Sequence, residues 1–211
     1  MVAEVCRRHR DDKEGARGMA GLSPHLLDRS NVVLVIVDVQ ERLARVMSRR
    51  EEVLGAIVLL VRVARALDVP VIVTRQNPDG LGDVVPEIAE ALPSDALIVD
   101  KYAFCCGAEA SFADTLASVD RGQVVLVGME AHICIAQTAL ALLERGSLVH
   151  VAADAVCSRR DADRDGALAR LQAAGAEITC AESVAYELVE RAGTEEFRQV
   201  LRSVKERDGT P

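Results

Sequence analysis

The sequence predicts an α/β fold in which a mainly parallel sheet is covered by helices on both faces. Short runs of β-branched residues alternate with longer amphipathic runs rich in Ala and Leu, which is the pattern of repeated βαβ units. Half of the residues are hydrophobic but only 2% are aromatic, so the core has to be aliphatic, as is usual in sheets buried on both faces. We expect a disordered tail over residues 1–22, where charges mix with glycine, and a single domain over residues 23–211.

The expected elements follow this alternation along the chain. Strands are expected at residues 32–37, 71–74, 96–99, 124–127, 148–152 and 177–179. Helices are expected at residues 49–67, 108–118, 133–144, 161–174 and 183–192, and a last helix begins near Thr194. Gly146, Gly175 and Gly193 follow three of these helices, as glycine often does at helix ends. Residues 75–86 form the longest expected loop, and it should overhang the carboxyl edge of the sheet.

Charge, hydropathy and cysteine usage exclude several classes of protein. The sequence has 33 acidic and 25 basic residues, and its net charge of −8 opposes binding to phosphate backbones. The longest run without a formal charge, residues 131–143, is about two-thirds of a membrane span. Acidic residues at 11, 12 and 14 occupy the place of a signal peptide's apolar stretch, and the 6 cysteines include no CxxC pair. We therefore expect a cytoplasmic protein with reduced thiols that binds a small molecule, and neither nucleic acid nor a membrane.

Three reactive side chains are predicted at the carboxyl ends of strands, the edge where open parallel sheets form their sites. Asp38 follows the first strand, Lys101 follows the third, and Cys134 lies after the fourth, where a loop gives way to a helix. The helix dipole and a nearby lysine favour a thiolate, so the sequence predicts that the pKa of Cys134 lies below its ordinary value of about 8.5. Asp38 could then accept the thiol proton or hold Lys101 in place.

Each of these residues also has an ordinary structural interpretation. A cysteine is more often packed than catalytic, an aspartate at a strand end often caps a turn, and a lysine there is mostly solvated. Only their joint placement favours a site. The alternatives have less support, because no GxGxxG, GxxxxGK[ST] or GxSxG motif is present and the 4 histidines lack metal-ligand spacing. His132 could be a base, line the pocket or make a local hydrogen bond, and Cys105 and Cys106 could pack or line the pocket rim.

The residues around these strand ends resemble those of the isochorismatase-like cysteine hydrolases. The similar segments are residues 37–40 around Asp38, residues 101–104 beginning with Lys101, and residues 128–134 ending with Cys134. A narrower likeness to the isochorismatase-domain-containing subgroup is carried by residues 74–82, 85–88, 130–138 and 149–155. The resemblance extends over roughly residues 30–205, which is most of the chain.

The resemblance implies a three-layer α/β/α fold with a six-stranded parallel sheet in the order 3-2-1-4-5-6, which brings Asp38 close to Cys134. It implies catalysis by Asp38, Lys101 and Cys134, and a cis peptide bond between Met129 and Glu130. It also implies an oxyanion hole formed by the backbone N–H groups of Glu130 and Cys134. The substrate pocket is expected to include Gln40, Gln76, Tyr102, Phe104 and His132. A homo-oligomer is expected as well, since members of the family commonly associate.

Two departures from related enzymes narrow the expected chemistry. The nicotinamidases of this superfamily hold a metal through an Asp and a His after the second strand, where this chain has Gln76 and Pro78, so we expect neither a metal nor another cofactor. True isochorismatases cleave a vinyl ether and generally do not use the cysteine. The presence of Cys134 favours hydrolysis of a small amide through a thioester. The alternatives are vinyl-ether hydrolysis led by Asp38 and Lys101, and a catalytically silent oligomeric interaction protein.

Overall fold

The strands of the protein form one parallel sheet. The computed structural model describes residues 23 and 25–209, so the tail predicted at residues 1–22 lies outside the described residues. The strands are β1 (Val32–Val37), β2 (Val71–Gln76), β3 (Leu97–Lys101), β4 (Gln123–Met129), β5 (Leu148–Cys157) and β6 (Glu177–Thr179). Their order is β3-β2-β1-β4-β5-β6, which confirms the predicted topology. The strands β1 and β4 are therefore central neighbours, and Val37 pairs with Gly128 near their carboxyl ends.

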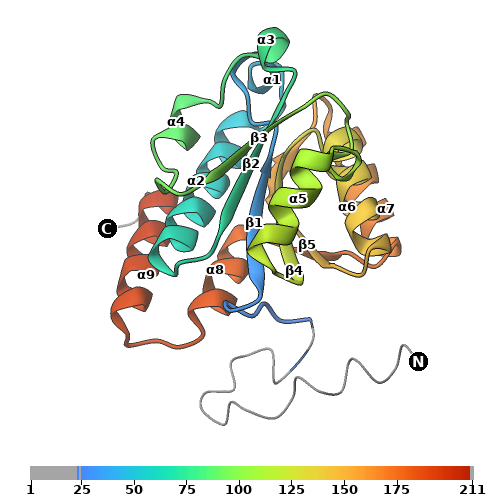
Figure 1. The fold of residues 1–211 in the computed structure, drawn as a ribbon. Helices are drawn as coiled ribbons and strands as arrows, with labels where there is room; N and C mark the ends of the chain where they lie inside the picture. The colour runs from blue at the N-terminus through green and yellow to red at the C-terminus, as the bar shows by residue number, and fades with distance from the viewer. Residues whose placement is uncertain (1–22, 24, 210–211) are drawn as a thin grey trace, which may run out of the picture.

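Helices cover both faces of the sheet (Figure 1). One layer consists of α2 (Arg50–Ala66), α8 (Ala181–Val189) and α9 (Glu195–Asp208). The other consists of α5 (Ala110–Val119), α6 (Ala136–Glu144) and α7 (Asp161–Ala173). Shorter helical segments are α1 (Glu41–Ala44), α3 (Pro78–Leu81), α4 (Pro86–Ala89), the 3₁₀ turn η3 (Cys106–Ala108) and the π-helical turn η4 (Ala131–Ile135). The predicted three-layer arrangement is thus confirmed.

The central strand β1 is buried along its whole length. Leu34 and Ile36 pack into the layer beneath α2, α8 and α9, whereas Val33 and Val35 pack into the layer beneath α5, α6 and α7. Because both faces of the strand are covered, the sequence of β1 is continuously apolar and does not alternate with polar residues. Burial of each such side chain contributes roughly 1.5–3 kcal/mol, so this strand anchors both layers.

The segment predicted as a long loop at residues 75–86 is more regular than expected. Arg75 and Gln76 continue β2 and pair with Asp100 and Lys101 of β3. After Asn77 the chain forms the single turn of α3, with proline in its first turn. Proline and glycine suggested a turn, but proline suits the first turn of a helix equally well because its missing N–H would have no partner there. The extension of β2 brings Gln76 to the edge of the sheet where the predicted site lies.

The chain around β4 also departs from the predicted boundaries. β5 extends to Cys157 beyond a register shift opposite Leu126 and Gly128, and the helical segment after β4 begins with a π-helical turn at Ala131. Gly128 has a φ of 121°, and a Cβ there would overlap the carbonyl oxygen of Val37. Glycine is therefore required where β4 comes closest to the end of β1.

The cysteines at positions 105, 106, 134, 157 and 180 are free thiols. Cys106, Cys134 and Cys157 are buried, whereas Cys105 and Cys180 are partly exposed. None of the helices in the described part of the chain is long and apolar enough to span a membrane.

Candidate active site

Asp38 lies at the end of β1 in an unusual backbone conformation. Its φ is 57°, in the left-handed region, which costs an ordinary residue about 1–2 kcal/mol but which aspartate tolerates better than most. Its N–H donates to the carbonyl of Thr74 over 3.1 Å, and the Thr74 hydroxyl donates to Oδ1 of Asp38 over 2.7 Å. The side chain is fully buried. Thr74 of β2 thus fixes both the backbone and the carboxylate of Asp38.

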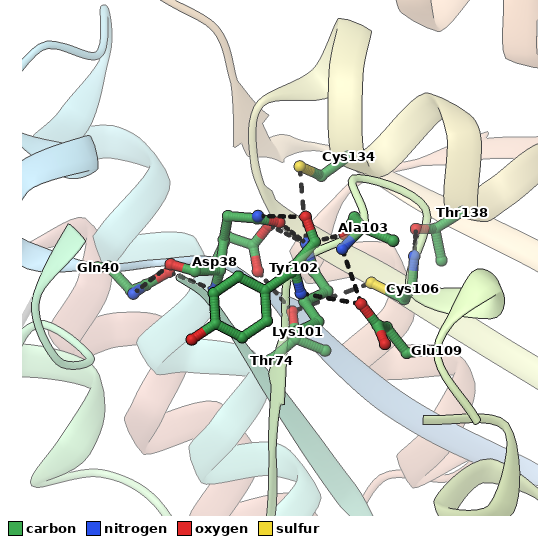
Figure 2. Close-up of polar contacts among 11 residues, drawn as sticks. Asp38, Gln40, Thr74, Lys101, Tyr102, Ala103, Cys106, Glu109, Cys134 and Thr138 are labelled. Atoms are coloured by element: carbon green, nitrogen blue, oxygen red, sulfur yellow. Dashed lines mark hydrogen bonds and ion pairs between the residues drawn. The ribbon is translucent and has the colours of Figure 1, made fainter. Parts of the chain in front are cut away.

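Lys101 reaches the same carboxylate from the end of β3 (Figure 2). Its Nζ lies 2.7 Å from Oδ2 of Asp38, 2.6 Å from Oε1 of Gln76 and 3.2 Å from the carbonyl oxygen of Ala103. Burial alone would lower the pKa of Lys101, but the charge of Asp38 and the neighbouring thiols raise it above its ordinary value. With three oxygen acceptors for its three hydrogens, the ammonium remains protonated.

Cys134 completes the cluster from the π-helical turn after β4. Its Sγ lies 3.8 Å from Nζ of Lys101, and the residue is only 5% exposed. Burial raises the pKa of Cys134 well above its ordinary value, and the nearby carboxylate of Asp38 raises it further. Lys101 opposes this effect only in part. The prediction of a depressed pKa was wrong, because dehydration and the carboxylate outweigh the lysine and the helix start.

Glu130, directly before the π-helical turn, is fixed through both its backbone and its side chain. The Met129–Glu130 peptide bond is cis, at the position that the family resemblance implies. The carbonyl oxygen of Glu130 accepts hydrogen bonds from the N–H groups of Ile133 and Ile135, over 3.1 and 3.2 Å. Its buried carboxylate accepts two hydrogen bonds of 3.1 Å from Arg159. These contacts hold the turn that carries Cys134.

The side chains of the two glutamines expected in the pocket form hydrogen bonds with other groups of the same chain. Gln40 is fully buried, accepts a hydrogen bond from the N–H of Gln76 over 2.7 Å and donates to the carbonyl of Gly82 over 2.7 Å. The amide of Gln76 accepts from Lys101 and donates to the carbonyl of Tyr102 over 2.7 Å. Gln40 therefore lies behind the site, and Gln76 lies in its wall beside the ammonium.

The other three residues expected in the pocket differ in their surroundings. Tyr102 is 67% exposed and Phe104 is 55% exposed, and both closely follow Lys101 in the chain. His132 is partly buried, and its Nδ1 lies 2.9 Å from the hydroxyl of buried Ser158. The side chain of His132 is thus held at the end of β5.

With this geometry established, comparison with known proteins identifies the family. Residues 32–183 match the Isochorismatase domain family. The chain belongs to the isochorismatase family. Isochorismatase domain-containing protein 2 of Danio rerio is 37% identical over 185 residues, which cover 87% of this chain and 91% of the relative. The secreted isochorismatase effector Isc1 of Phytophthora sojae is also 37% identical, with 82% of this chain and 84% of the relative covered.

Two solved structures are similar to this isochorismatase-family chain. The MAR1 ribonuclease from Caenorhabditis elegans superposes with a TM-score of 0.80 at 37% identity, covering 85% of this chain and 92% of the other. YcaC from Pseudomonas aeruginosa, whose structure contains hexane-2,5-diol and covalent acrylamide, superposes with a TM-score of 0.77 at 27% identity. That match covers 87% of this chain and 94% of YcaC.

Sequence reasoning missed two residues, Thr74 and Glu109, that support the site of this isochorismatase-family member. Thr74 lies beside Asp38 and is the last residue of the strand predicted at residues 71–74, so its place at a predicted strand end was an available signal. Cys106, which the sequence suggested could pack or line the pocket rim, is fully buried near Lys101, and burial raises its pKa to about 11. Glu109 binds the backbone of the loop after β3, and nothing in the sequence distinguishes it from a residue that merely precedes a helix.

Where the nicotinamidases hold a metal ion, this chain has Gln76, whose side chain forms hydrogen bonds within the protein. Oε1 of Gln76, the oxygen that a metal would need, accepts a hydrogen bond from Lys101. Among residues 23 and 25–209, no group of three or more His, Cys, Asp or Glu side chains is arranged to hold a metal ion.

Proposed function

We propose that this protein is a cysteine hydrolase that cleaves a small amide-type substrate through a thioester on Cys134. The observation that carries the proposal is one buried ammonium, that of Lys101, which lies 2.7 Å from the carboxylate of Asp38 and 3.8 Å from Sγ of Cys134. A nucleophile, a proton acceptor and a fixed cation in one dehydrated place are what covalent catalysis at a carbonyl needs. Membership of a hydrolase family agrees with this chemistry.

The first step is transfer of the thiol proton to Asp38 as Sγ attacks the carbonyl carbon of the substrate. We assign the role of base to Asp38, because its carboxylate shares the ammonium of Lys101 with Sγ of Cys134, whereas Lys101 keeps its proton. The positive charge of Lys101 then stabilises the anion as it forms. We assign the oxyanion to the backbone N–H groups of Glu130 and Cys134, as the family resemblance implies.

The second half of the reaction returns every group to its starting state. The leaving amine takes the proton from Asp38 as the carbon–nitrogen bond breaks, and the acyl group remains on Sγ of Cys134. Water then attacks the thioester carbonyl and gives a proton to Asp38, which returns it to the departing sulfur. Each proton is thus carried by one carboxylate, and the cycle requires no metal or other cofactor.

The buried position of Cys134 favours a small substrate whose reacting carbonyl can enter beside the thiol. We assign contacts with the remainder of the substrate to Tyr102 and Phe104, because these exposed aromatic side chains closely follow Lys101. We also propose that the protein is a cytoplasmic homo-oligomer, although the related Isc1 protein is secreted.

Three other functions make different predictions. Ribonuclease activity, suggested by the MAR1 relative, is disfavoured by the net charge of −8, which repels a phosphate backbone. Vinyl-ether hydrolysis led by Asp38 and Lys101 would survive the substitution Cys134→Ala. A silent interaction protein would form no acyl intermediate with any compound.

The deciding experiment is detection of an acyl group on Cys134. The protein is incubated with a panel of small amides, esters and carbamates, quenched in acid, digested and analysed by mass spectrometry. We expect an acyl adduct on the peptide that contains Cys134 and no adduct in Cys134→Ala, with Cys157→Ala as the matched control for loss of a buried thiol. Turnover that persists in Cys134→Ala would overturn the thioester mechanism.

A further inference from the structure

The loop after β3, residues 102–105, is next to the nucleophile but is not held in place by burial of its aromatic side chains. Tyr102 and Phe104 are both mostly exposed. The carbonyl of Ala103 nevertheless binds Nζ of Lys101, the same nitrogen that lies beside Sγ of Cys134. Polar contacts to the backbone must therefore fix the position of this loop.

Glu109 provides two of these contacts through one oxygen. Its Oε1 accepts hydrogen bonds from the N–H groups of Tyr102 and Ala103, over 2.9 and 2.7 Å, as Figure 2 shows. The carbonyl groups of the same two residues receive hydrogen bonds from Gln76 and Lys101. The N–H groups thus bind the glutamate, and the carbonyls bind the two side chains that form the wall of the site.

A role in capping its own helix does not explain this position of Glu109. The residue directly precedes α5, but its side chain makes no capping hydrogen bond to that helix. Its carboxylate is directed to the loop instead. The two backbone hydrogen bonds lower the pKa of Glu109, and the positive charge of Lys101 adds to this effect, so the group is ionised at neutral pH.

We propose that Glu109 is a positioning residue that holds residues 102–105 closed over the site and so keeps the ammonium of Lys101 beside Cys134. The proposal rests on the proposed function for its catalytic meaning, but its structural content concerns the accessibility of one thiol. If the loop opens, water reaches Cys134 and one acceptor of the ammonium is lost. Because burial is the main reason for the raised pKa of Cys134, an open loop lowers that pKa and speeds alkylation.

Three substitutions separate the hydrogen bonds that Glu109 accepts from the effect of its negative charge: Glu109→Ala, Glu109→Gln and Glu109→Asp. Alanine removes both, glutamine keeps an oxygen acceptor without the charge, and aspartate keeps the charge but shortens the reach by one methylene. We expect Ala and Asp to open the loop, and Gln to retain it. Asp114→Ala is the matched control, since Asp114 is an acidic residue of the adjoining helix α5.

The measurement is peptide-resolved labelling by iodoacetamide between pH 6 and pH 10. We expect Cys134 to label roughly tenfold faster in Glu109→Ala and Glu109→Asp, which corresponds to a decrease of about one pKa unit. Glu109→Gln should stay within about twofold of the wild type, and buried Cys157 should label equally slowly in every variant.

Two results would overturn the proposal, and both are independent of the substrate. If Cys134 labels at the wild-type rate in Glu109→Ala and Glu109→Asp, the loop does not depend on this residue. If Cys106, Cys134 and Cys157 all label faster together, Glu109 has a general role in stability and does not position the loop. Failure of the thioester proposal would appear separately, as the absence of an acyl adduct on a Cys134 that still responds to Glu109.

Discussion

Nζ of Lys101 lies 2.7 Å from Oδ2 of Asp38, and neither side chain is accessible to solvent. The two residues come from β3 and β1, with β2 between them, so the long lysine side chain spans the width of one strand. Cys134 follows β4, which neighbours β1 on the other side, and the same carboxylate raises the pKa of its thiol. One carboxylate therefore raises the pKa of the lysine and adds to the effect of burial in raising the pKa of the cysteine.

Replacement of Asp38 with asparagine should have opposite effects on thiol reactivity and on catalysis. The substitution removes the charge that raises the pKa of Cys134, so iodoacetamide should label this thiol faster at neutral pH. Turnover should fall by about 10²–10⁴-fold, because no group remains to move the protons. Labelling and turnover are measured on the same samples, with Asp100→Asn as an exposed control that also loses a carboxylate. Faster labelling of buried Cys157 in the same variant would show instead that the substitution disturbs the structure as a whole, and unchanged labelling of Cys134 would contradict the effect of the Asp38 charge.

Replacement of Lys101 with methionine should destabilise the protein. The buried carboxylate of Asp38 would lose its cation, a change that costs about 3–5 kcal/mol when one partner of a buried pair is removed. The double variant Asp38→Asn/Lys101→Met removes both charges and should recover most of this loss. Urea unfolding of the two single variants and the double variant measures the coupling. Equal destabilisation of the double and the Lys101 variant would contradict this account of the pair.

The order in which the cysteines react with iodoacetamide should differ from the order that the sequence predicts. The sequence suggests that Cys134 is the most reactive, whereas its thiol is buried and its pKa is raised. We expect the partly exposed Cys105 and Cys180 to label first at pH 7, and Cys134 to follow only as the solution becomes alkaline. Labelling time courses at several pH values, resolved by peptide, test this order. Fast labelling of Cys134 at pH 7 would instead support the thiolate that its place at a helix start predicts.

Stability should decrease in mild acid because of His150. This residue of β5 is buried, its Nε2 has no hydrogen-bond partner in the described structure, and burial lowers its pKa, an effect that nearby Glu177 opposes and His25 reinforces. The unfolded chain therefore binds a proton at a higher pH than the folded chain, so stability is lost as the pH falls below about 6.5. Urea unfolding at pH 7.5 and 5.5 should show a smaller decrease for His150→Phe than for the wild type or His25→Gln. An unchanged decrease would assign the acid sensitivity to other groups.

Much of the fold and part of the site follow from local sequence patterns. β1 was predicted with its observed bounds, because a short, continuous apolar run rich in valine and bounded by polar segments is typical of a strand buried on both faces. Asp38, Lys101 and Cys134 were found because each lies at or just after a strand end. Their contact, however, depends on the order of the strands, and this order came from the family resemblance rather than from the pattern.

The charge state of Cys134 could not be obtained in the same way. Position at a helix start predicts a low pKa, but the degree of burial and the distance to Asp38 are tertiary properties. Glu109 was missed for a related reason. Its partners are backbone N–H groups of a loop. Almost every residue has such a group, so the sequence does not show which of them bind Glu109.

The protonated resting state of Cys134 has a consequence for the lifetime of the protein. Peroxide and other cellular electrophiles react with thiolates far faster than with thiols, so a nucleophile stored as a thiol resists oxidative damage between turnovers. In the proposed mechanism, reactivity is generated only when a carbonyl compound occupies the site and Asp38 takes the proton. If the thioester mechanism holds, we expect such an enzyme to give up some speed in each encounter but to remain active during oxidative stress, under which a permanently ionised cysteine would be oxidised.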